Sequence, residues 1–67
     1  MIADKKRAAV YIADYVSRIE AAREENDSFL VGYYRELLKT AEEEFRAFYG
    51  DKGLTDIQVD ALKLLTK

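Results

Sequence analysis

The segment Glu24-Glu25-Asn26-Asp27-Ser28 separates two helical patterns in this chain, and its conformation sets the fold. The segment is polar and rich in residues that begin or end helices. A turn here predicts a helical hairpin, whereas an uninterrupted helix would run from Ala3 to Tyr49 and self-associate through a seam that includes Arg23 and Asn26. We favour the turn, because weak helix formers and Gly32 cluster at this point.

Residues 3–25, before this segment, show the spacing of an amphipathic helix. Apolar side chains recur at intervals of three and four, and charged side chains occupy the opposite face. The predicted apolar stripe consists of Ala8, Ile12, Tyr15, Ile19 and Ala22, with Ala9 and Val16 beside it.

Residues 29–49, after the segment, repeat the same spacing. Gly50 follows, and we expect it to end this second helix because glycine adopts the left-handed conformation at little cost. The predicted stripe consists of Leu30, Tyr34, Leu37, Leu38, Ala41, Phe45 and Phe48.

The last part of the chain carries the pattern of a capping box. Thr55 is followed three residues later by Gln58, and this pair predicts a short third helix from Asp56 to about Thr66. The expected fold class is therefore all-α: a hairpin of two long helices plus a short third helix, which together form a three-helix bundle and a single helical domain over residues 1–67. The alternative is the long continuous helix that self-associates.

The composition argues against an enzyme. Histidine and cysteine are both absent, which removes the usual bases, nucleophiles and soft metal ligands. The acidic run at residues 42–44 reads as a solvated face, since neighbouring helical residues point about 100° apart; Glu44 borders the second stripe and has no assigned role. We expect no catalytic residue, no metal site and no cofactor. With no disulfides, a chain of 67 residues must gain its stability from helix packing or self-association.

The charge pattern and hydropathy narrow the class of protein further. The net charge is −2 and the charged residues of both signs are interleaved. No apolar run approaches the roughly 20 residues of a membrane span. We expect a cytoplasmic protein of the small bacterial or phage accessory type, with no membrane partner.

Tyrosines at the edges of the two stripes point to a protein-binding surface. Tyr11 and Tyr15 fall on one edge of the first stripe, and Tyr33 falls on the edge of the second. A tyrosine at an edge packs its ring while its hydroxyl stays hydrated, and such residues recur at interfaces. We therefore expect a small non-enzymatic binding module, a regulator, adaptor or inhibitor, that acts on a protein partner and forms a homodimer. The cluster Lys5, Lys6 and Arg7 would supply a polar rim.

The sequence is also compatible with two other functions. The cluster Lys5, Lys6 and Arg7 could instead contact nucleic acid, in an accessory protein of that class. Residues 54–65 resemble the opening helix of the helix-turn-helix in response-regulator and sigma-factor families, which implies DNA binding, but we expect no recognition helix to follow because the sequence ends at Lys67. The remaining alternative is a purely structural homo-oligomer, in which self-association covers the tyrosine edges.

Overall fold

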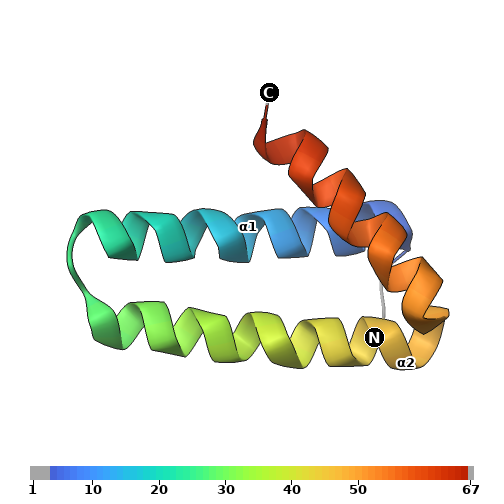
Figure 1. The fold of residues 1–67 in the computed structure, drawn as a ribbon, viewed down its shortest axis with the longest axis horizontal. Helices are drawn as coiled ribbons and strands as arrows, with labels where there is room; N and C mark the ends of the chain where they lie inside the picture. Colours follow the sequence, from blue (N-terminus) through green and yellow to red (C-terminus); the bar gives the residue numbers. More distant parts are fainter. Residues whose placement is uncertain (1–3, 67) are drawn as a thin grey trace.

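The computed structural model describes residues 4–66, and within them every regular element is helical. Helix α1 spans Lys5–Glu24 and helix α2 spans Ser28–Leu65. Figure 1 shows α1 lying antiparallel beside the first part of α2, with the end of α2 turned back across α1. The predicted all-α hairpin is therefore confirmed. Among the described residues, neither helix is both long enough and apolar enough to cross a bilayer.

The connection between the helices is a tight turn over Glu25–Asp27. Asn26 adopts a left-handed φ of 57°, which asparagine tolerates better than most residues. The amide of Asp27 donates to the carbonyl of Ala22, and the amide of Asn26 donates to the carbonyl of Arg23, the two bonds that end a helix in a Schellman motif. The alternative of one continuous helix from Ala3 to Tyr49 is therefore wrong.

The side chain of Asp27 then starts α2 by accepting a hydrogen bond from the amide of Leu30 at 3.1 Å. Asp27→Ala should lower the free energy of unfolding by about 1 kcal/mol, because the first turn of α2 loses its cap. Urea denaturation followed by circular dichroism measures this difference. Asp27→Asn is the matched control, since asparagine caps equally well. An equal loss in both variants would contradict the assignment of the cap.

A sharp bend at Gly50 divides α2. Gly50 has φ 80° and ψ 174°, whereas the residues on both sides of it are helical. The bend matches the positions of the apolar residues on its two sides. Phe45 and Leu54 are nine residues apart, about two and a half helical turns, so a straight helix would point them to opposite sides. The bend turns residues 51–65, here called the arm, so that both side chains are buried against α1.

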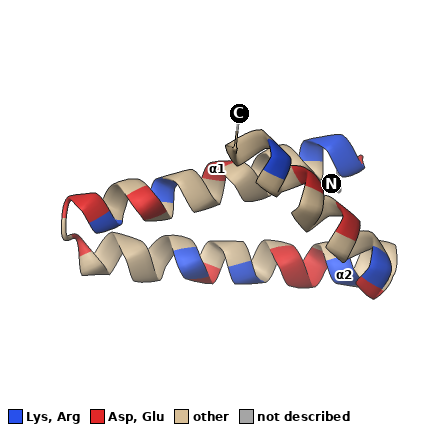
Figure 2. Cartoon of the chain, turned by 45° about the horizontal axis from the view of Figure 1, so that its top comes forward, with Lys and Arg blue, Asp and Glu red and all other residues tan. Residues whose placement is uncertain are grey.

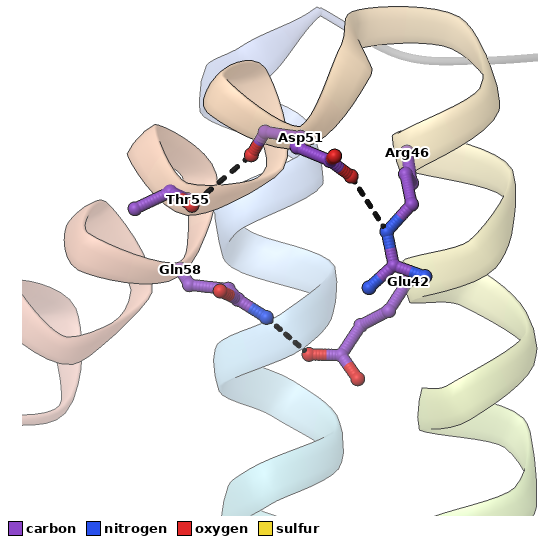
Figure 3. Close-up of polar contacts among 5 residues, drawn as sticks. All are labelled: Glu42, Arg46, Asp51, Thr55 and Gln58. Atoms are coloured by element: carbon purple, nitrogen blue, oxygen red, sulfur yellow. Dashed lines mark hydrogen bonds and ion pairs between the residues drawn. The ribbon is translucent and has the colours of Figure 1, made fainter.

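The predicted third helix, from Asp56 to about Thr66, is not a separate element. The arm is the last part of α2, helical from the residue after Gly50 onward. The predicted capping box is also wrong. The hydroxyl of Thr55 donates to the carbonyl of Asp51 at 3.0 Å, and the amide of Gln58 donates to Glu42 across the bend at 2.7 Å (Figure 3). An ion pair of 3.1 Å between Arg46 and Asp51 joins the two sides of the same bend.

The core lies where the arm crosses α1. Alanines on α1 allow the arm to approach closely, and Ile57 of the arm is fully buried. The expected core residue Phe48 is instead 64% exposed, and its neighbour Tyr49 packs against the core. The buried cluster consists of Ala8, Ala9, Ile12, Ala13, Phe45, Leu54, Ile57 and Ala61.

Candidate protein-binding surface

The start of α2 carries no charge on any side. Residues 28–34 read SFLVGYY, almost two turns at about 3.6 residues per turn. Figure 2 shows this part of α2 as an uncharged segment next to the connection, whereas charged residues recur farther along the helix. A helix without polar faces is normally buried. This segment, here called the aromatic tip, instead forms one end of the hairpin.

Two aromatic rings of the aromatic tip face outward. Phe29 is 78% exposed and Tyr33 is 52% exposed. Their rings stack one helical turn apart, with centroids separated by 6.5 Å and planes inclined by 9°. Tyr34, which is half-buried, meets Tyr33 edge-on at 5.4 Å. The three rings form a preassembled row, and rings of this kind are enriched at the centres of protein interfaces.

A residue of helix α1, Arg18, contacts the half-buried ring of this row, Tyr34. The guanidinium of Arg18 lies 5.8 Å from the centre of the Tyr34 ring. Its Nε donates to the Oδ2 of Asp14 at 2.9 Å. The hydrogen bond to Asp14, and after it the hydrogen bond to Tyr34, raises the pKa of Arg18 above its usual value. Arg18 thus contacts the aromatic tip through Tyr34 and its own helix through Asp14.

The structure does not gather the three predicted interface tyrosines on one site. Tyr33 belongs to the aromatic tip, and Tyr15 is half-buried on α1. Tyr11 is 54% exposed and lines a separate shallow hollow with Arg7, Val10 and Asp14. It lies seven residues before Arg18, about 10 Å farther from the tip along the helix axis.

The three basic residues of the predicted rim have different surroundings. Lys5 pairs with Asp56 of the arm at 3.7 Å, and its Nζ lies 5.8 Å from the centre of the Tyr49 ring. Lys6 lines an apolar hollow between α1 and the arm, together with Asp60 and Lys63 of the arm. Arg7 lines the hollow beside Tyr11. Lys5 thus contacts the arm, whereas Lys6 and Arg7 line two different hollows.

Another concave surface, the groove between α1 and α2, is less suited to docking a protein. Its apolar floor is narrow, formed by Val16, Ile19 and Leu38. Binding an apolar partner there would require several charges to lose water, which is unfavourable unless each finds a counter-charge. The charged residues that line it are Glu20, Arg23, Arg35, Glu36, Lys39 and Glu42.

No family model matches this chain. No curated protein and no solved structure matches it either. The aromatic tip is therefore identified as a candidate protein-binding surface from its geometry and exposure alone.

The carboxylates of residues 42–44 differ from the expectation in one respect. Glu44, expected at the edge of the core, is exposed. Glu42 is the half-buried carboxylate, and it accepts the hydrogen bond from Gln58. Within residues 4–66, acidic side chains do not gather in a group of three that would hold a metal ion.

The spacing of apolar residues does not reveal Phe29 as part of this surface. Helical spacing marks the side of a helix that faces a partner helix, and Phe29 lies off that side. The signal that would have found it is the absence of charge over residues 28–34 together with the four-residue spacing of Phe29 and Tyr33.

Proposed function

We propose that this chain is a non-enzymatic protein-binding module whose docking surface is the aromatic tip. The observation that carries the proposal is the exposure of Phe29 and Tyr33, stacked on each other within a segment that has no charged side chain. Exposed apolar patches on a small protein mark interaction sites. Rigid aromatic rings also lose little conformational freedom on binding.

The partner that this surface fits is a protein with an apolar face, and a second copy of the chain is the simplest such partner. Two aromatic tips related by a two-fold axis would stack identical rings on each other, as an isologous dimer requires. Each copy would cover the other's Phe29 and Tyr33 and leave the charged helical faces in water.

Phe29→Glu should weaken this self-association at least about tenfold, because a buried ring is replaced by a charge that would have to lose its water. Sedimentation equilibrium from micromolar to millimolar concentration measures the change. The folded chain should keep its helix content, since Phe29 is mostly exposed.

Phe48→Glu is the matched control, because Phe48 is also exposed on α2 and lies near the bend rather than at the tip. It should self-associate as the wild type does. A wild-type chain that stays monomeric at millimolar concentration, or two variants with equal effects, would contradict self-association through the aromatic tip.

A further inference from the structure

Gly50 is the single residue within Ser28–Leu65 whose backbone is not helical. The helix is regular immediately before and after it, so a change of φ and ψ at this one position would make α2 straight. The bend and the straight helix are thus two arrangements of the same helical segments, separated by one residue.

A straight α2 would take the arm away from its own α1. Its 38 residues would extend over about 57 Å, whereas the longest dimension of the folded chain is 34 Å. Leu54 and Ile57 would then point away from the side of the hairpin that Phe45 faces. The alanine face of α1, formed by Ala8, Ala9, Ile12 and Ala13, would lose its cover at the same time.

We propose that Gly50 is a hinge through which two copies of this chain exchange arms. In the exchanged dimer the arm of each copy lies on the α1 of its partner. The arm is the segment that fits this face, because the closed chain already packs Leu54, Ile57 and Ala61 against it without burying a polar or charged residue. The hydrogen bond between Glu42 and Gln58 and the ion pair between Lys5 and Asp56 would form again between chains.

This exchange goes beyond the proposed function, since it uses the bend and not the aromatic tip. The two ends are distinct: Arg18 meets Tyr34 at the tip, and Lys5 meets Tyr49 near the bend. Because closed and exchanged forms share their contacts, the conformation at position 50 and the protein concentration decide between them.

The conformation of Gly50, φ 80° and ψ 174°, belongs to a region of the backbone map that is essentially reserved for glycine. Gly50→Ala therefore disfavours the bend, and alanine also favours a continuous helix. We expect Gly50→Ala to shift the chain toward the exchanged dimer by about tenfold or more. Gly32→Ala is the matched control, because Gly32 has open space around it and no unusual φ.

Crosslinking detects exchange directly. The chain contains no cysteine, so a Lys6→Cys chain and an Asp60→Cys chain each carry one thiol. Lys6 on α1 and Asp60 on the arm line the same hollow. The two chains, distinguished by mass, are mixed, refolded together and treated with a short bis-maleimide. The two substitutions placed in one chain show that the reagent reaches across the hollow.

A crosslink between the Lys6→Cys chain and the Asp60→Cys chain requires the arm of one copy to lie on the α1 of the other. The crosslinked product should be abundant with Gly50→Ala and scarce with Gly32→Ala. With Gly50 intact, its yield should rise with protein concentration during refolding. Should Gly50→Ala fail to fold, this concentration series decides. Absence of the product at millimolar concentration would overturn the exchange. A dimer paired only through the aromatic tip would give no such product.

Discussion

Ile57→Ala should lower the free energy of unfolding by about 2–5 kcal/mol. Ile57 has no exposed surface and sits in the cluster that joins the arm to α1. Removing three carbons there leaves a cavity that rigid helices fill only in part. The total free energy of unfolding of a chain of this size is roughly 3–10 kcal/mol. The variant should therefore be partly unfolded at 37 °C. Urea denaturation at 25 °C, followed by circular dichroism, gives the difference.

Leu62→Ala is the control for Ile57→Ala. Leu62 belongs to the same arm but is 61% exposed, so its truncation should change the free energy of unfolding by no more than about 0.5 kcal/mol. Similar losses in the two variants would mean that the arm is not packed on α1 through Ile57.

Gly53→Ala should be destabilising by about 1–3 kcal/mol, the range for overpacking a filled site. A Cβ at position 53 would collide with the Cβ of Tyr49, an atom close to the backbone that cannot turn aside. The arm would have to move away from the preceding helix, and the pairing of Lys5 with Asp56 would be disturbed. Thermal unfolding of the variant should show a lower midpoint.

Gly32→Ala tests the same substitution where space is open. No atom lies within 4 Å of the place its Cβ would take. Gly32 lies inside α2, where alanine is favoured over glycine by about 1 kcal/mol. The two substitutions should therefore move the unfolding midpoint in opposite directions. A rise of the midpoint in both variants would show that helix propensity, and not the contact with Tyr49, controls position 53.

The helices and the turn between them could be predicted because their causes are local. The spacing of apolar residues identifies each helix, and Asn26 and Asp27 carry the residue types that end one helix and begin another. Gly50 was expected to end the second helix; its positive φ bends α2 instead, and the helix continues to Leu65. These features depend on residues only a few positions apart.

The arm could not be derived in the same way, because distant residues set its start and its contacts. The spacing of Thr55 and Gln58 has the form of a capping box, yet Gln58 donates to Glu42, sixteen residues earlier. Near the bend Lys5 and Gly53 both approach Tyr49, and it is Tyr49, not Phe48, that packs on the core. The spacing of apolar residues alone does not show that Tyr49 replaces Phe48 on the buried side of the helix near the bend.

The candidate surface, too, could be predicted from the sequence only in part. Tyr33 was recognised from its place at the edge of a stripe, and it lies in the aromatic tip. The exposure of Phe29 depends on where the hairpin ends and on the arm crossing at the far end, which the spacing of apolar residues does not reveal. For the same reason Tyr11, which is as exposed as Tyr33, lies elsewhere on the surface, and Tyr15 is half-buried.

The crossing of the arm over α1 also bears on synthesis of the chain. The core joins Ala8, Ala9 and Ile12 to Leu54, Ile57 and Ala61, residues that the ribosome makes more than forty positions later. A nascent chain can form the turn at Asn26 and pair α1 with the first part of α2 early, because those contacts are close in sequence. Its alanine face stays open to water until the arm emerges, so this face is the part of the growing chain that a chaperone or a neighbouring nascent chain meets first.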